Sequence, residues 1–154
     1  MDLLVKLYAL PPDERVTPRA GEPNVRRAFA AEKGIVRRWI AQQFGDRWAS
    51  ESEAAFARSP IACFVAVVEN ELAGFACYDA TARGFFGPFG VAEQHRRRGT
   101  GRALLFAALR DMAAQGYGYA IIGAAGSIEF YRKGLDVIEI PDSAPGFYRG
   151  MLRG

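Results

Sequence analysis

A mixed α/β (α+β) fold, with a central twisted sheet and helices on both of its faces, is predicted by three features of the sequence. Three apolar strand candidates follow one another at residues 61–68, 72–79 and 84–91. An amphipathic helix candidate at residues 101–115 comes next and provides the only long crossover between strands. The chain has 154 residues, half of them hydrophobic, which suits one domain that folds without disulfides or a structural metal.

The N-terminal region differs from the rest of the chain. Residues 2–8 are apolar enough for a strand or one helical turn, and three prolines and a glycine then interrupt regular structure. We therefore expect residues 1–22 to form an arm packed on the domain, and residues 23–154 to form a single domain.

A strand and two helices are predicted ahead of the strand candidates. The strand covers residues 24–30. Apolar side chains recur at helical spacing over residues 32–44, and Gly45 ends that helix. A shorter helix at residues 50–58 begins with Ser50, a residue type that caps helix N-termini, and carboxylates occupy its first turn.

The strand candidates at residues 61–68 and 72–79 are separated by a three-residue turn, so they are expected to form a hairpin. The third candidate, residues 84–91, is unusual because Pro88 cannot donate to a ladder and lies between two glycines. Such residues belong at a bulge or where another backbone approaches closely.

The remaining elements follow the long helix at short intervals. They are a strand at residues 119–122, a turn of small residues at 123–126, a short helix at 127–133 and two strands at 136–140 and 147–151.

Charge and cysteine content argue against several classes of protein. The formal net charge is only +3 and the basic residues form one compact cluster, a poor match to a nucleic-acid-binding surface. No apolar run is long enough to span a membrane, and the N-terminus is too polar for a signal peptide. Cys63 and Cys77 show neither metal-ligand nor disulfide spacing. We expect a cytoplasmic protein that binds neither nucleic acid nor a membrane.

The basic cluster lies between the unusual strand and the long helix. Residues 94–102 hold four arginines and two glycines, Gly99 and Gly101. Glycines let backbone N–H groups approach an anion, the helix N-terminus adds partial positive charge, and arginines pair with phosphate oxygens. The spacing is neither that of a P-loop nor that of a dinucleotide-binding fingerprint. It predicts a pyrophosphate site, and the alternative is a solvated basic turn.

Residues 96–101 (RRRGTG) resemble the coenzyme A loop of the GNAT superfamily of N-acetyltransferases, which reads Q/R-x-x-G-x-G/A at a strand-to-helix junction. Gly74-Phe75, Val91 and residues 130–134 are also similar to the family, and the resemblance covers residues 60–151. It implies a GNAT-like sheet that is mostly antiparallel and splayed between its fourth and fifth core strands. It also implies acetyl-CoA as co-substrate and no metal.

In this family the pantetheine arm of coenzyme A pairs with exposed backbone on the fourth strand, which would explain the proline and glycines there. The alternative is an ordinary edge strand. The resemblance implies that the N–H of Val91 donates to the thioester carbonyl, and that Ser127 replaces an Asn often found after the fifth strand. The predicted coenzyme-binding residues are Phe89, Gly90, Val91, Arg96, Arg97, Arg98, Gly99, Thr100, Gly101, Arg102, Ser127 and Tyr131.

Tyr131 is the predicted general acid, because the family often places a Tyr on this short helix. A phenol stays protonated at neutral pH and can give its proton to the leaving thiolate. The alternative is a Tyr packed on the sheet with its hydroxyl satisfied.

The general base stays open. Many family members carry a Glu on the fourth strand, but residues 84–92 contain no carboxylate. The candidates are Asp79, Glu93, Glu51, Glu53 and a water relay.

Together these features predict an acetyl-CoA-dependent N-acetyltransferase that acts on a primary amine of a small molecule. Direct transfer in a ternary complex is expected, because neither cysteine has a partner that would activate it as a nucleophile. The alternative is a non-catalytic acyl-CoA binding module, and a homodimer is left open. The predicted wall of the acceptor pocket comprises Phe44, Trp48, Tyr78, Phe85, Phe86, Phe147 and Tyr148.

Overall fold

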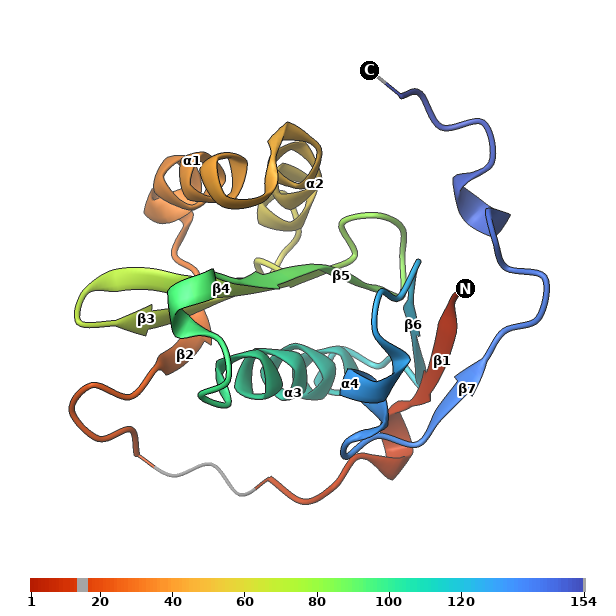
Figure 1. Cartoon of the computed structure of the whole chain (residues 1–154), viewed down its shortest axis with the longest axis horizontal. Helices are drawn as coiled ribbons and strands as arrows, with labels where there is room; N and C mark the ends of the chain where they lie inside the picture. Colours follow the sequence, from red (N-terminus) through yellow and green to blue (C-terminus); the bar gives the residue numbers. More distant parts are fainter. Residues whose placement is uncertain (14–16, 154) are drawn as a thin grey trace.

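The computed structural model describes residues 1–13 and 17–153, and its centre is one seven-stranded sheet (Figure 1). The strands are β1 (Leu3–Lys6), β2 (Asn24–Arg27), β3 (Cys63–Val68), β4 (Glu71–Tyr78), β5 (Phe85–Val91), β6 (Tyr119–Ile122) and β7 (Val137–Glu139). Their spatial order is β2-β3-β4-β5-β6-β1-β7. Residues 14–16 of the predicted arm, and residue 154 at the end of the predicted domain, lie outside the described residues.

Helices cover both faces of the sheet. The α-helices are α1 (Lys33–Phe44), α2 (Asp46–Phe56), α3 (Thr100–Ala114) and α4 (Ile128–Arg132). The 3₁₀ turns are η1 (Leu7–Ala9), η2 (Ala30–Glu32), η3 (Glu93–His95) and η4 (Gly146–Tyr148). Figure 1 shows α1 and α2 on one face and α3 on the other. The predicted α/β class, with helices on both faces, is confirmed.

All pairs of neighbouring strands are antiparallel except β5 and β6. These two strands pair in parallel only through Phe85 with Ile121 and Phe86 with Ile122. Beyond Phe86 the ladder of β5 continues with β4 alone. Because β5 and β6 are the fourth and fifth core strands counted from β2, the predicted splay is confirmed.

The long helix α3 owes its place to the predicted apolar stripe. Leu104, Leu105, Leu109 and Met112 are all buried against the sheet. The stripe recurs every three or four residues and therefore covers one side of the helix.

The N-terminal segment is a strand of the sheet. β1 lies between β6 and β7 and pairs antiparallel with both. Leu3 and Val5 are almost fully buried there. The choice between a strand and a helical turn at residues 2–8 is resolved as a strand followed by η1.

Several predicted boundaries were wrong. Helix α2 begins at Asp46, directly after Gly45, so Ser50 is inside the helix and does not cap it. β2 ends at Arg27 because Glu32 accepts hydrogen bonds from the Arg26 side chain and from the Phe29 N–H, which turns the chain into η2. The strand predicted at residues 147–151 is absent; β1 occupies the place beside β7, and η4 lies at residues 146–148 instead.

The two cysteines are free and buried, and they face each other across β3 and β4 as the Cα partners Cys63 and Cys77. None of the helices in the described part of the chain is long and apolar enough to span a membrane.

Candidate active site

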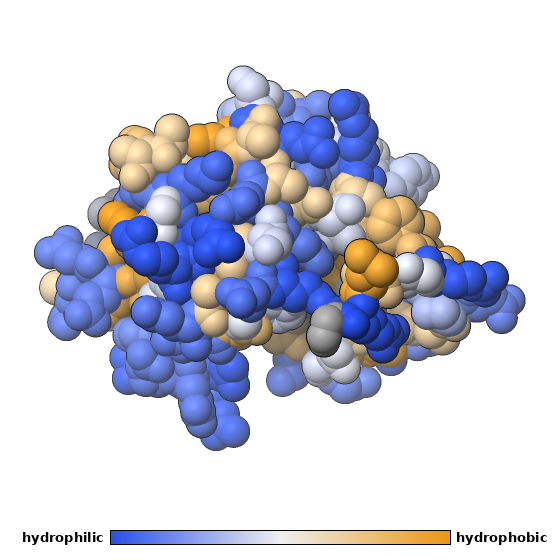
Figure 2. Space-filling model, turned by 90° about the horizontal axis from the view of Figure 1, so that it is seen from above, coloured by the Kyte–Doolittle hydropathy of each residue, from blue (hydrophilic) through white to orange (hydrophobic). Residues whose placement is uncertain are grey.

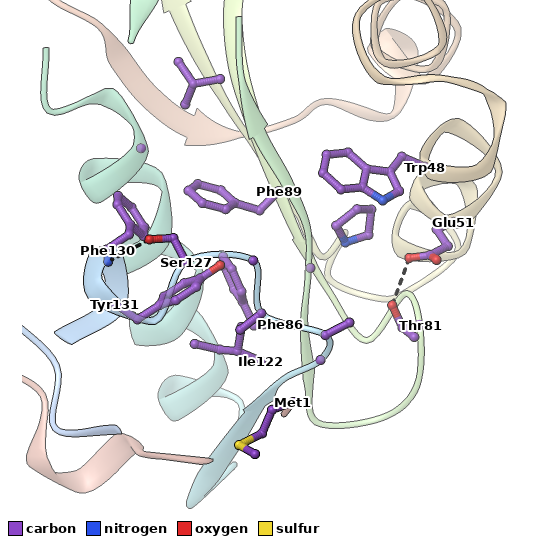
Figure 3. Close-up of a pocket in the computed structure, with 18 of the residues that line it drawn as sticks. Met1, Trp48, Glu51, Thr81, Phe86, Phe89, Ile122, Ser127, Phe130 and Tyr131 are labelled. Carbon is purple, nitrogen blue, oxygen red and sulfur yellow. Dashed lines mark hydrogen bonds between the residues drawn. The ribbon is translucent and has the colours of Figure 1, made fainter. Parts of the chain in front are cut away.

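A cavity of about 1010 Å³ opens where β5 separates from β6. Its walls come from α2, the second half of β5, the loop before α3, the β6–α4 turn, α4 and the C-terminal segment. Figure 3 shows Trp48 and Glu51 on one side of this space and Phe130 and Tyr131 on the other. Most of the predicted site residues therefore meet at one place.

At the end of β5, the backbone groups of Phe89 and Val91 face this cavity. The N–H of Ala92 donates to the Ala73 carbonyl on β4 at 2.8 Å. Since antiparallel strands alternate in the direction of their polar groups, Phe89 and Val91 direct theirs away from β4, toward the open edge. The Val91 carbonyl there accepts from Arg96 Nε at 3.0 Å. The N–H groups of Phe89 and Val91 are thus aimed at the cavity.

Gly90 lies between them, and its backbone polar groups point toward β4. It pairs with Phe75 on β4 and does not line the cavity. A Cβ at Gly90 would lie 2.6 Å from the ring of Phe44, so the glycine lets the end of α1 pack closely on β5.

The arginine loop leads into α3. Gly99 precedes the helix with φ of 78°, a left-handed conformation that glycine adopts without strain. Arg96, Arg97 and Arg102 line the cavity, whereas Arg98 is exposed and does not. Arg102 donates to the Lys133 carbonyl and also stacks on the ring of Phe106. The loop thus gathers guanidinium groups beside the free N–H groups that open α3.

The other predicted coenzyme-binding residues near the loop also include some that line the cavity and one that does not. Gly99 and Gly101 line the cavity, and Thr100 is buried and does not. Ser127 lines the cavity and caps α4, with its hydroxyl accepting from the Phe130 N–H at 3.4 Å.

Tyr131 projects from α4 into the cavity (Figure 3). Only 8% of the residue is exposed, and burial raises the pKa of its hydroxyl to about 12. No described residue forms a hydrogen bond with this hydroxyl. Tyr131 is therefore a protonated donor whose hydroxyl is available to a ligand.

The structure separates the four candidate carboxylates. Glu51 lines the cavity, where its carboxylate accepts from the Thr81 hydroxyl at 2.9 Å. Glu53 pairs with Arg37, and Asp79 accepts from the Gly84 N–H and the Tyr117 hydroxyl. Glu93 is exposed on η3 and lies outside the cavity. Glu51 is the single carboxylate among the described residues that line the cavity.

The predicted aromatic wall is only partly present. Trp48, Phe86 and Tyr148 line the cavity. The remaining four do not: Phe44 packs behind Gly90, Phe85 and Phe147 contact each other, and the Tyr78 hydroxyl bonds to Asp111 on α3.

Sequence reasoning missed part of the cavity wall. Thr81 and Arg47 belong to it, and so do the C-terminal residues Ser143, Ala144, Pro145, Met151 and Arg153. The turn after β6 accommodates this segment because a Cβ at Gly123 would overlap the Tyr148 hydroxyl. Asp2 connects the turn after β6 to the C-terminal segment. Its carboxylate accepts from the Ala124 N–H, and its backbone N–H donates to Ser143 Oγ. The small residues at 123–126 were the one signal in the sequence for a close approach here.

Comparison with known families agrees with this geometry. A model of the acetyltransferase (GNAT) family matches residues 33–136, about two thirds of the chain. The chain belongs to this family. A search of curated protein sequences finds no significant match.

Solved structures share the GNAT fold with this chain. A GCN5-related N-acetyltransferase from Sphaerobacter thermophilus aligns over 89% of this GNAT chain and 47% of its own, with a TM-score of 0.66 and 19% identity. A GNAT family acetyltransferase from Brucella melitensis, solved in complex with acetyl-CoA, aligns over 73% and 80%, with a TM-score of 0.57 and 16% identity. An aminoglycoside acetyltransferase from an uncultured soil metagenomic sample aligns over 70% and 82%, with a TM-score of 0.50 and 19% identity. This chain spans about half the length of the Sphaerobacter thermophilus protein.

The cavity presents groups that suit the polar parts of coenzyme A. Free N–H groups on β5 suit an extended amide arm, and the arginine loop beside α3 suits a pyrophosphate. In the described ranges, no group of three His, Cys, Asp or Glu side chains is placed to hold a metal ion.

Proposed function

We propose that this chain is an acetyl-CoA-dependent N-acetyltransferase that transfers the acetyl group directly to a primary amine of a small molecule. One observation carries the proposal: the open edge of β5 faces a cavity that is lined by arginines of the loop before α3 and by the carboxylate of Glu51. Tyr131 lines the same cavity, on the side opposite Glu51 (Figure 3). The soil-metagenome structure, which is named as an aminoglycoside acetyltransferase, supports a small-molecule amine as acceptor.

Acetyl-CoA would be held by its two polar parts. The backbone N–H groups of Phe89 and Val91 would donate to the pantetheine amides, as in the addition of a strand to a sheet edge. Arg97, Arg102 and the N–H groups at the start of α3 would bind the pyrophosphate. The bound molecule supplies an acetyl group activated as a thioester.

Two groups of the chain would then assist transfer. The N–H of Val91 is aimed at the open edge, where it can donate to the carbonyl oxygen as negative charge develops on it. The Tyr131 hydroxyl can donate to the departing sulfur, because its pKa of about 12 keeps it protonated at neutral pH.

We assign the general base to Glu51. An amine arrives as an ammonium ion and must lose a proton before it attacks. Glu51 is the only carboxylate among the described lining residues, and the Thr81 hydroxyl orients it. A covalent acetyl-cysteine route is disfavoured because Cys63 and Cys77 are fully buried and outside the cavity.

A non-catalytic acyl-CoA binding module is the second candidate. The absence of any carboxylate on β5 itself favours it. The two candidates share the coenzyme site and differ only in chemistry.

Isothermal titration of acetyl-CoA tests the shared site. We expect micromolar binding that is weakened about tenfold or more in the Arg97→Ala, Arg102→Ala double variant, because charged hydrogen bonds to phosphate are lost. Arg38→Ala, an exposed arginine of α1 outside the cavity, is the matched control. Absence of binding to the unaltered protein would exclude both candidates.

A screen of small primary amines, with release of free thiol as the readout, separates the candidates. The enzyme releases thiol in the presence of an amine, and Glu51→Gln lowers this rate by about 100-fold while acetyl-CoA binding is kept. Binding of acetyl-CoA without amine-dependent thiol release would favour the binding module.

A further inference from the structure

We propose that the acceptor is a primary amine that also carries a carboxylate, and that Arg47 and Arg153 bind this carboxylate. The inference rests on the proposed function and names the class of acceptor. Both arginines line the cavity, one from α2 and one from the C-terminal segment. Figure 1 shows the C-terminal segment after β7 reaching the side of the sheet that α2 covers, away from α3. Figure 2, seen from this side, shows a surface on which hydrophilic residues predominate.

Arg47 and Glu51 are neighbours on one face of α2. They are four residues apart, a spacing that places two helical side chains beside each other. The pair does not form a salt bridge; the Glu51 carboxylate accepts from the Thr81 hydroxyl. Within the described chain, neither Arg47 nor Arg153 has a hydrogen-bond or ion-pair partner. Two guanidinium groups of the cavity wall, one of them beside Glu51 on α2, are therefore free to bind an anion.

Helix stability does not account for Arg47. The first turn of a helix carries partial positive charge, so it favours Asp46 and disfavours a cation such as Arg47. Its neighbour Trp48 also faces the cavity, so this turn of α2 is turned toward the site.

The charges of the cavity select against a polycation, so the acceptor inferred for this chain differs in charge from an aminoglycoside. Glu51 is the single lining carboxylate within the described ranges, whereas the lining cations are Arg47, Arg96, Arg97, Arg102, Lys133 and Arg153. One ammonium group can pair with Glu51, but further positive charges on the acceptor would meet Arg47 and Arg153. A carboxylate on the acceptor removes that repulsion and accepts paired hydrogen bonds from a guanidinium.

The spacing and the aromatic wall narrow the class further. Side chains four apart on a helix have Cβ atoms roughly 5–6 Å apart, so a carboxylate bound by Arg47 and an amine beside Glu51 can belong to one small molecule. Trp48, Phe86 and Tyr148 line the same cavity and offer apolar surface to the rest of the molecule. An α-amino acid with an apolar or aromatic side chain has all three features.

Matched pairs of amines test the proposal directly. Phenylalanine is compared with phenethylamine, tryptophan with tryptamine, and spermidine represents the polycations. We expect kcat/KM to be about 10- to 100-fold higher for each amino acid than for its decarboxylated partner, since hydrogen bonds to a charged group are involved. Equal or higher values for the decarboxylated amines would overturn the inference.

Charge reversal identifies the residue responsible. Arg47→Glu is expected to abolish the preference for the amino acid and to improve spermidine relative to it, and Arg153→Ala to reduce the preference. Arg38→Glu, which makes the same charge change on α1 outside the cavity, leaves the ratio unchanged. An unchanged ratio in Arg47→Glu contradicts the assignment even if the ratio in the unaltered protein is high.

A product-binding measurement keeps the two proposals separable. Titration of N-acetylphenylalanine and N-acetylphenethylamine into the coenzyme A complex reports carboxylate recognition without turnover. Tighter binding of the acid by about tenfold or more, lost in Arg47→Glu, supports the carboxylate site even if no amine is acetylated. Acetylation of plain amines with equal binding of both products refutes the carboxylate site and leaves the proposed function intact.

Discussion

Tyr131 combines burial with an unpaired hydroxyl. Burial raises its pKa to about 12, well above the value of about 8.5 for an ordinary thiol. Complete proton transfer from this phenol to a thiolate would therefore be uphill. Tyr131 is better suited to stabilise the departing thiolate by donating a hydrogen bond. The strength of that one hydrogen bond then limits how much the residue can increase the rate of transfer.

We therefore expect Tyr131→Phe to lower kcat by about 10- to 100-fold, the equivalent of one hydrogen bond to a charged group. Because the hydroxyl stays protonated below its pKa of about 12, the loss should be constant between pH 6 and 10. Steady-state kinetics across this range, with titration of acetyl-CoA, checks it. Tyr8→Phe, which removes an exposed hydroxyl outside the cavity, is the control. A loss that varies with pH in this range would contradict the assignment.

In the last part of strand β5, alternate residues direct their backbone groups to β4 and to the cavity. Phe89 and Val91 direct their backbone groups to the open edge, whereas Gly90 pairs with β4 and lets Phe44 approach from α1. This close approach links the helical layer to the strand that forms the site. Gly90 is thus a packing requirement, although the sequence indicated only an interrupted strand.

Gly90→Ala should destabilise the protein by about 1–3 kcal/mol, because the added Cβ would lie 2.6 Å from the Phe44 ring. Urea unfolding measures the change. Gly118→Ala is the matched control, since a Cβ there would meet nothing within 4 Å. The double variant Gly90→Ala, Phe44→Leu should recover part of the loss, and equal stability of Gly90→Ala and the unaltered protein would refute the packing argument.

At the scale of the whole molecule, the two ends of the chain complete the sheet and the cavity. β1 lies between β6 and β7, and Asp2 bonds to both the β6–α4 turn and Ser143. β1 also pairs with β6, which lies more than 100 residues further along the chain. Through these contacts the N-terminal segment supports the part of the cavity wall that contains Ser127 and Tyr148.

Leu3→Ala should cost about 2–5 kcal/mol of unfolding free energy, as expected for a large side chain removed from a packed core. Leu3 is 0% exposed, whereas Ile35 on α1 is 56% exposed, so Ile35→Ala serves as the control with little effect. Thermal and urea unfolding of both variants test this. Similar stability of the two variants would mean that β1 is dispensable.

Local patterns determined much of this protein. Apolar periodicity predicted the hairpin, the long helix and the strand at residues 119–122, because periodicity depends on residues a few positions apart. The arginines and glycines before α3 predicted an anion site, and the structure places three of these arginines and both glycines in the wall of a cavity.

The tertiary structure alone decided the rest. Pairing of β1 with β6 and β7, the position of Glu51 as the one candidate carboxylate in the cavity wall, and the C-terminal part of that wall all depend on segments far apart in the chain. The strand predicted at residues 147–151 failed for the same reason, since β1 occupies the place beside β7. No local pattern records which distant segment will compete for a sheet edge, because that outcome is settled by burial of apolar surface across the whole molecule.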